Sequence, residues 1–252
     1  MVLTPEGEQL PCRIKGKFRL KGIRTTNPVA VGDRVTVGDV PSPDGVYYIV
    51  AISPRDNYII RRASNLSKES HIIAANIDQA VLVMTLAHPT TATMFVDRFL
   101  ATAEAYRVKA VLLINKVDLL TDCEDIELLD AFSYLYRSIG YDVLHVSAKT
   151  GAGMDAVREM MGGRITLFSG NSGVGKSTLI NDLIPGLDLR TAEISHTHDA
   201  GMHTTTFSEM FFLPGGRDAG AVIDTPGVRG FGTIDFDRHE VGHFFPEIFR
   251  ES

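Results

Sequence analysis

The sequence predicts an α/β domain on a parallel sheet, preceded by a small all-β barrel of the OB type. After residue 70, short apolar runs at 79–85, 109–114, 143–146, 164–169 and 221–223 alternate with segments of helical spacing, as in a parallel sheet covered by helices. Earlier, short segments are separated by turn signals such as Gly32-Asp33 and residues 42–45, which favours a small barrel. We therefore expect domains at 1–70 and 71–235, and the start of a C-terminal region at 236–252.

The first domain carries a ribbon of positive charge. Cations alternate with apolar residues, so an extended strand would place them on one face: Arg13, Lys15, Lys17, Arg19 and Lys21. Such neighbours repel one another, and an anionic surface such as RNA would neutralise them. Residues 1–70 carry a net charge of +4, whereas the remainder carries −10. A solvated, half-buried strand gives the same alternation, so periodicity alone leaves both interpretations open.

An amphipathic helix is predicted from about residue 95. Its apolar residues recur on one face: Phe95, Val96, Phe99, Leu100, Ala103 and Tyr106. Packing against the sheet explains these residues better than any cofactor role does.

A candidate base-recognition loop, Asn115-Lys116-Val117-Asp118, follows the apolar run at 110–114. An ionised carboxylate at Asp118 only accepts hydrogen bonds, so it suits the adjacent N1–H and 2-amino donors of guanine. Adenine has no donor at N1 and would leave the charge unpaired. GTP is therefore favoured over ATP, although the tetrapeptide alone is a weak signal and also fits a helix-capping loop.

A glycine-rich loop between a predicted strand and a predicted helix supplies the phosphate site. Its members are Gly170, Asn171, Ser172, Gly173, Val174, Gly175, Lys176, Ser177 and Thr178. The glycines let backbone N–H groups surround a phosphate chain, Lys176 neutralises the terminal phosphates, and Ser177 is a candidate Mg²⁺ ligand. A chance glycine-rich loop would lack the flanking strand at 164–169 and the helical spacing of 177–184.

Three further segments complete the expected set. Ser147-Ala148-Lys149 follows the strand predicted at 143–146 and is similar to the loop that packs against guanine in GTPases. Asp224 and Gly227 belong to the segment 224–227, which follows the strand predicted at 221–223. There a carboxylate would lie near Mg²⁺ and a glycine N–H near the γ-phosphate. The run 204–206 offers a hydroxyl for Mg²⁺, and we favour Thr205 as the ligand.

The order of these segments is permuted, because the base loops precede the phosphate loop. Loops at the carboxyl ends of parallel strands depend on strand positions in space, so the site survives this permutation. The sequence resembles the ribosome small subunit-dependent GTPase A family of circularly permuted bacterial GTPases. The resemblance covers nearly the whole chain and rests on the segments 31–35, 115–118, 170–178, 201–206 and 224–232.

The resemblance implies an assembly factor that hydrolyses GTP in late maturation of the small ribosomal subunit, with the subunit and its rRNA as partners. It implies Mg²⁺ and GTP or GDP as cofactors, an N-terminal OB fold on rRNA and a C-terminal zinc-binding region. Zn²⁺ ligands of the family's cysteine-rich kind are absent from this sequence, which ends at Ser252, so we expect a truncated C-terminal region. Cys12 and Cys123 are expected to be reduced structural thiols.

The catalytic arrangement is open at the sequence level. Where Ras-like enzymes carry a water-orienting glutamine, this chain has Val228, which cannot hydrogen-bond through its side chain. His203 is the candidate replacement, and Lys176 and Thr205 are the other candidate catalytic residues. A purely conformational role for His203 is the alternative. Met202 stands where the family usually has a basic residue. We expect slow intrinsic turnover that the subunit stimulates.

Composition excludes some classes of protein. With 44% apolar and 22% charged residues, no apolar signal core and no run long enough to span a bilayer, we expect a cytoplasmic enzyme without a membrane partner. The net charge of −6 argues against a generic nucleic-acid binder, and we expect no DNA partner. We also expect a monomer, although the sequence does not show the oligomeric state. Two other functions remain: a metabolic P-loop kinase, which the segments 115–118 and 224–227 disfavour, and a nucleotide-gated module that binds another RNA, with incidental hydrolysis.

Overall fold

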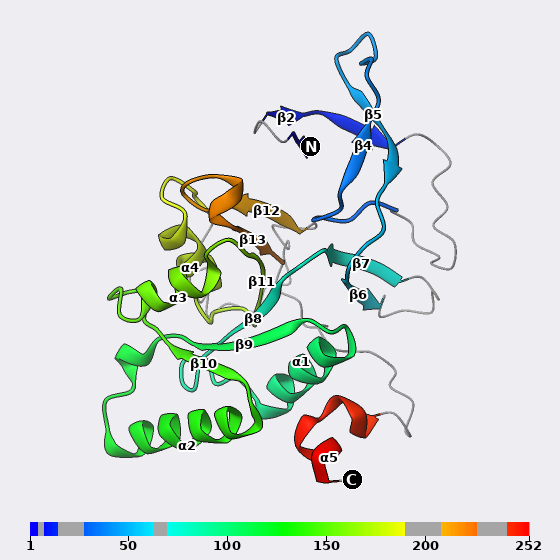
Figure 1. The fold of residues 1–252 in the computed structure, drawn as a ribbon. Coiled ribbons are helices and arrows are strands. Elements are labelled where there is room, and N and C mark those ends of the chain that lie inside the picture. The colour runs from blue at the N-terminus through cyan, green and yellow to red at the C-terminus, as the bar shows by residue number, and fades with distance from the viewer. Residues whose placement is uncertain (5–7, 15–27, 63–69, 190–207, 226–240, 252) are drawn as a thin grey trace, which may run out of the picture. The chain divides into compact units, whose positions relative to one another are not determined.

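The computed structural model describes residues 1–4, 8–14, 28–62, 70–189, 208–225 and 241–251. The chain divides into two compact units, Met1–Ile77 and Asp78–Ser252. Figure 1 shows the elements of both units. None of the helices in these ranges is both long and apolar enough to cross a membrane.

The described part of the first unit is all-β, as the sequence predicts. Its strands are β1 (Val2–Leu3), β2 (Gln9–Leu10), β3 (Cys12–Ile14), β4 (Val35–Val37), β5 (Tyr47–Ile52), β6 (Tyr58–Arg62) and β7 (Ser70–Ala75). β1 pairs antiparallel with β2, and β6 with β7, while β5 lies between a parallel β3 and an antiparallel β4. The pairing of β7 with β6 keeps residues 70–77 in this unit.

A buried ion pair stabilises the turn at residues 30–33. The Arg55 guanidinium donates through Nε and Nη2 to the two carboxylate oxygens of Asp33, both at 2.6 Å, and the side chains are 8% and 1% exposed. Asp33 also accepts from Ala30 N at 2.8 Å. A Cβ on Gly32 (φ +89°) would lie 2.0 Å from the Ala75 carbonyl oxygen, so only glycine fits this turn beside β7.

The second unit is an α/β domain on a six-stranded sheet in the order β10-β9-β8-β11-β13-β12. Its strands are β8 (Gln79–Met84), β9 (Lys109–Ile114), β10 (Asp142–His145), β11 (Ile165–Ser169), β12 (Glu209–Phe212) and β13 (Ala221–Asp224). All pairs are parallel except β12 with β13, which is antiparallel. Five strands therefore end at the same edge of the sheet.

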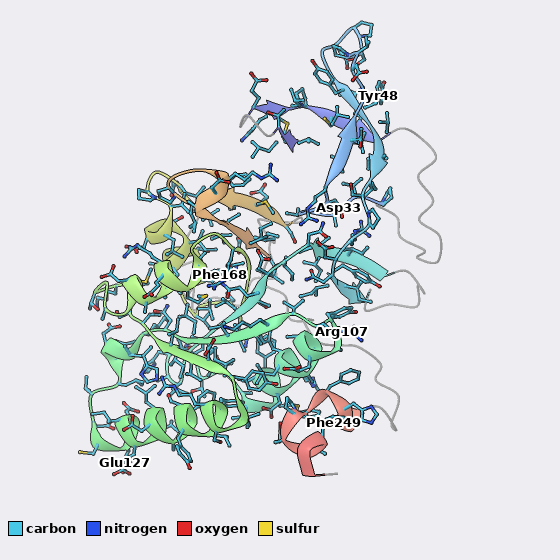
Figure 2. All side chains as sticks on the ribbon, viewed as in Figure 1. Asp33, Tyr48, Arg107, Glu127, Phe168 and Phe249 are labelled. Atoms are coloured by element: carbon cyan, nitrogen blue, oxygen red, sulfur yellow. The ribbon has the colours of Figure 1, made fainter. Side chains whose placement is uncertain are left out.

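Helices cover both faces of this sheet (Figure 1). One face packs on α1 (Thr93–Ala105) and α2 (Cys123–Ile139), and the other on α3 (Met154–Met161) and α4 (Lys176–Leu183). Alternation along the strands explains this division, because Val81 and Val83 join the α3 and α4 core. Phe168, labelled in Figure 2, is fully buried in that core.

Short helical segments complete the unit. They are the 3-10 helices η1 (Val117–Leu119), η2 (Arg217–Ala219) and η3 (Val241–Phe244), and the helix α5 (Pro246–Glu251). η3 contacts both α1 and α5. The C-terminal segment therefore packs on the face of the sheet that carries α1.

Candidate nucleotide-binding site

The site residues lie where parallel strands end. Asn115 follows β9, Val146 follows β10, Gly170 follows β11, and Asp224 is the last residue of β13. Loops at the carboxyl ends of neighbouring parallel strands form the usual ligand crevice of an open α/β sheet. The topology thus gathers four segments that are far apart in the sequence.

Asn115 joins three of these four segments directly. Its side chain is almost fully buried, its Nδ2 donates to Val174 O at 2.8 Å, and its Oδ1 accepts from Ala148 N at 3.1 Å. One side chain therefore fixes the loop after β9 to the glycine-rich loop and to the loop after β10.

Asp118 is held by the loop after β10. The hydroxyl of Ser147, itself fully buried, donates to Asp118 Oδ1 at 2.6 Å and accepts from Thr150 N at 3.2 Å. Asp118 remains partly exposed, and Lys149 lies exposed in the same loop. The carboxylate is thus oriented by a neutral hydroxyl and keeps acceptor capacity.

The glycine-rich loop is packed so closely that side chains are excluded. A Cβ on Gly170 would lie 2.5 Å from Val83 O, and a Cβ on Gly175 would lie 2.4 Å from Asn115 Nδ2. Gly173 and Gly175 have φ values of +84° and +89°, which favour glycine. The loop leads into α4 at Lys176, so free backbone N–H groups of the helix start lie in this loop.

Lys176 and Asp224 form an ion pair between the start of α4 and the end of β13. Their side chains are 10% and 12% exposed, and Lys176 Nζ also donates to Thr225 O at 3.0 Å. The Thr225 hydroxyl donates to Phe168 O at 2.9 Å, which fixes the end of β13 against β11. Ser177, next to Lys176, lies at the same edge of the sheet as Asp224.

One contact of the site was missed by the sequence analysis. Lys116 Nζ donates to Gly173 O at 2.7 Å and to His88 O at 2.6 Å. His88 follows β8, a strand to which the motifs assign no site residue. Because a main-chain carbonyl is the acceptor, no residue type could have indicated this contact.

Several candidate residues lie outside the described residues, and their placement stays a prediction: Lys15, Lys17, Arg19, Lys21, His203, Thr205 and Gly227. Of the basic ribbon, the structure describes Arg13 on β3, where it pairs with Asp44 at 3.3 Å. Both partners are more than half exposed, so this pair contributes little to stability.

Two further features bear on cofactors. Within the described ranges, no group of three or more His, Cys, Asp and Glu side chains could hold a metal ion. Cys12 and Cys123 are free thiols, and burial raises the pKa of Cys12.

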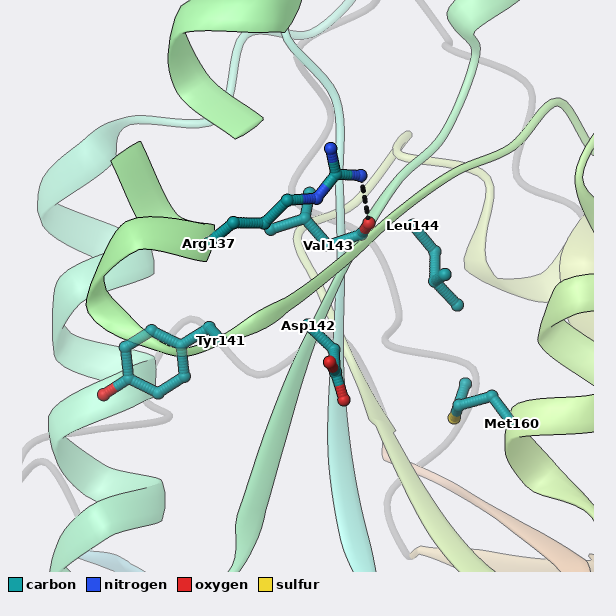
Figure 3. Close-up of a pocket in the computed structure, with 6 residues that line it drawn as sticks. All are labelled: Arg137, Tyr141, Asp142, Val143, Leu144 and Met160. Carbon is teal, nitrogen blue, oxygen red and sulfur yellow. Dashed lines mark hydrogen bonds between the residues drawn. The ribbon is translucent and has the colours of Figure 1, made fainter. Parts of the chain in front are cut away.

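A hollow of about 290 Å³ lies at β10, away from these loops. Arg137, Tyr141, Asp142 and Met160 contribute to its lining, and Arg137 Nη2 donates to Val143 O at 2.7 Å (Figure 3). Tyr141 and Asp142 lie at the amino end of β10, whereas the glycine-rich loop follows the carboxyl end of β11. The hollow is therefore not part of the candidate site.

The fold and the order of its loops define a circularly permuted P-loop GTPase. Residues 52–234 match the family model described as RsgA GTPase. The chain belongs to the RsgA GTPase family.

Curated relatives are similar over the whole chain. It is 59% identical to a small ribosomal subunit biogenesis GTPase RsgA of Bacteroides fragilis, covering 100% of this chain and 79% of that protein. It is 56% identical to the protein of the same name in Porphyromonas gingivalis, covering 100% of this chain and 80% of the relative.

Two solved structures share the fold. YjeQ from Thermotoga maritima is 33% identical with a TM-score of 0.72, over 96% of this chain and 75% of YjeQ. YloQ, described as a circularly permuted GTPase, is 26% identical with a TM-score of 0.65, over 98% of this chain and 72% of YloQ. The permuted GTPase fold predicted from the order of motifs is confirmed.

Proposed function

We propose that this GTPase binds GTP and GDP with Mg²⁺ at the carboxyl edge of its sheet and acts in biogenesis of the small ribosomal subunit. The observation that carries the proposal is the position of Asn115, which ties both base loops to the glycine-rich loop. The names of the relatives in Bacteroides fragilis and Porphyromonas gingivalis supply the ribosomal context.

The guanine base would be held by the loops after β9 and β10. Asp118 would accept from guanine N1–H and the 2-amino group, oriented by the bond from Ser147. Asn115, Lys116 and Val117 shape the same loop, and Ala148 and Lys149 the opposite one. This assignment predicts a preference for guanine over adenine nucleotides.

The phosphates would be held by residues 170–178, with Lys176 as the cation among them. The fit rests on the close packing of Gly170 and Gly175, which leaves backbone N–H groups rather than side chains around the loop. Ser177 and Asp224, with Thr205, offer the oxygen ligands that Mg²⁺ prefers. When bound, the ion would neutralise phosphate charge.

The ion pair of Lys176 with Asp224 fits such a site. Two opposite charges, each about nine-tenths buried, neutralise each other here. A phosphate chain would offer Lys176 a new anion, and a cation would offer Asp224 a new partner. Exchange of partners keeps both buried charges compensated.

Hydrolysis would depend on residues near Gly227 and on His203. Val228 cannot orient water, so we assign that role to His203, with Lys176 and Thr205 also acting on the reacting phosphate. Replacing His203 with Ala should lower turnover and leave GTP affinity unchanged. Turnover equal to that of the wild type would remove His203 from the mechanism.

The subunit would be contacted through the basic ribbon Arg13, Lys15, Lys17, Arg19 and Lys21. Replacing all five with Gln should weaken binding to the subunit and its salt dependence, without changing GDP affinity. We also infer a cytoplasmic monomer that engages neither DNA nor a membrane. Among the residues that the structure describes, no group of three or more His, Cys, Asp and Glu side chains could hold Zn²⁺.

The test is GTP turnover with and without purified small ribosomal subunits. We expect slow turnover alone and strong stimulation by the subunit. Turnover that the subunit does not change, together with GTP-dependent binding to another RNA, would instead identify a nucleotide-gated RNA-binding module. A Lys176→Ala variant controls for contaminating GTPases.

A further inference from the structure

The segment 85–91, between β8 and α1, is closed by its own hydrogen bonds. Thr85 N donates to Thr91 Oγ1 at 3.2 Å, and Thr91 N donates to Thr85 O at 2.9 Å. The Thr85 hydroxyl donates to Pro89 O. Thr85 is fully buried and Thr91 is 5% exposed, so the base of the segment is shielded from water.

This segment meets the glycine-rich loop and Lys116. The Lys116 ammonium is shared between His88 O at 2.6 Å and Gly173 O at 2.7 Å. The ring of Pro89 would lie 3.5 Å from a Cβ on Gly173. His88 is therefore the second anchor of a lysine that bridges two loops of the candidate site.

The two residues joined by the bond from Lys116 to His88 O both have a left-handed backbone. Within the described residues, four non-glycine residues have positive φ, and two of them are His88 (φ 52°) and Lys116 (φ 62°). Such conformations persist where the surroundings enforce them, and they cluster at functional sites. Here the enforcing contacts are the bonds of Thr85 and of Lys116.

We propose that residues 85–91 form a positioning loop of the nucleotide site. Thr85 fixes the peptide that follows Pro89, the residue next to His88, and His88 O then holds the Lys116 ammonium against the glycine-rich loop. A lysine side chain whose head is already held loses less conformational entropy when nucleotide binds, which raises affinity. This inference rests on the proposed binding of guanine nucleotide.

The first test compares GDP affinity, by calorimetry with Mg²⁺, in Thr85→Val and Thr102→Val variants. Thr102 is a matched control, because it is also fully buried and donates to a main-chain carbonyl, Arg98 O at 2.6 Å, in α1. Thr85→Val should weaken GDP binding roughly threefold to tenfold, the effect of one hydrogen bond. Thr102→Val should lower Tm but leave affinity unchanged, and Thr85→Ser should restore it.

The second test is a double-mutant cycle with Lys116→Met. If Thr85 acts through Lys116, Thr85→Val should weaken GDP binding less than about twofold in the Lys116→Met background. An equal loss in both backgrounds, or no loss in the wild-type background, overturns the inference. Failure of the proposed function differs, because the wild-type protein itself would then not bind GDP.

Discussion

Comparing Gly175→Ala with a matched control should separate the cost of a side chain at a left-handed backbone angle from the cost of breaking the hydrogen bonds of Asn115. The new Cβ would lie 2.4 Å from Asn115 Nδ2. Asn115 is only 3% exposed and is bonded at both ends, so it can move only by losing its bonds to Val174 O and Ala148 N. Two hydrogen bonds contribute about 1–3 kcal/mol, beyond about 1–2 kcal/mol for a side chain at left-handed φ.

Gly186→Ala is the matched control. Gly186 has φ +90°, against +89° for Gly175, and a Cβ there meets nothing within 4 Å. Both glycines belong to the second unit. The control should therefore lose only the backbone contribution to the free energy of unfolding.

Urea denaturation of the nucleotide-free variants measures the difference, and calorimetry measures GDP affinity. Gly175→Ala should be less stable than Gly186→Ala by about 1–3 kcal/mol, and should bind GDP at least about tenfold more weakly than the wild type. Gly186→Ala should bind GDP normally. Equal stability of the two variants, with normal GDP affinity in both, would refute the role assigned to Asn115.

Three other changes test separate parts of the account. Asp118→Asn should reduce the preference for GDP over ADP in competition binding, because the amide replaces one of the two acceptor oxygens by a donor, which then faces a donor of guanine; an unchanged preference would place base recognition elsewhere. Lys176→Ala should abolish measurable GDP binding and lower Tm in the nucleotide-free state, because Asp224 loses its partner, whereas a stable variant that binds GDP would contradict both roles. Burial, and then Arg137, lower the pKa of His145 from its usual value near 6.5. The unfolded chain therefore takes up a proton at His145 at a higher pH than the folded chain does. The contribution of neutral His145 to the free energy of unfolding is fully present above about pH 6.5 and is lost as pH falls through the folded pKa. In urea titrations, His145→Gln should therefore lose less stability over this range than the wild type.

The sequence predicts which loops meet, because their candidate side chains stand after apolar runs. Asn115, Asp118, Ser147 and Lys176 each follow an apolar run, and parallel strands bring such positions to one edge. The structure accordingly joins the loops that carry the first three: Ser147 donates to Asp118, and Ala148 N donates to Asn115. Side-chain chemistry and strand periodicity are enough for this part.

Main-chain contacts and strand direction are not predictable in this way. Every residue has a carbonyl, so the acceptor His88 O carries no sequence signal. An apolar run does not state its pairing direction, and β12 lies antiparallel at the edge of an otherwise parallel sheet. The division after Ile77 likewise depends on β7 pairing back to β6, which a change in local pattern near residue 70 does not reveal.

The most direct measurement is calorimetric titration of the wild-type chain with GDP and with ADP in the presence of Mg²⁺. The account predicts saturable binding of GDP at one site, much weaker binding of ADP, and loss of the GDP signal in Lys176→Ala. No heat with GDP, or equal affinity for the two nucleotides, would contradict a guanine-specific site at the carboxyl edge of this sheet.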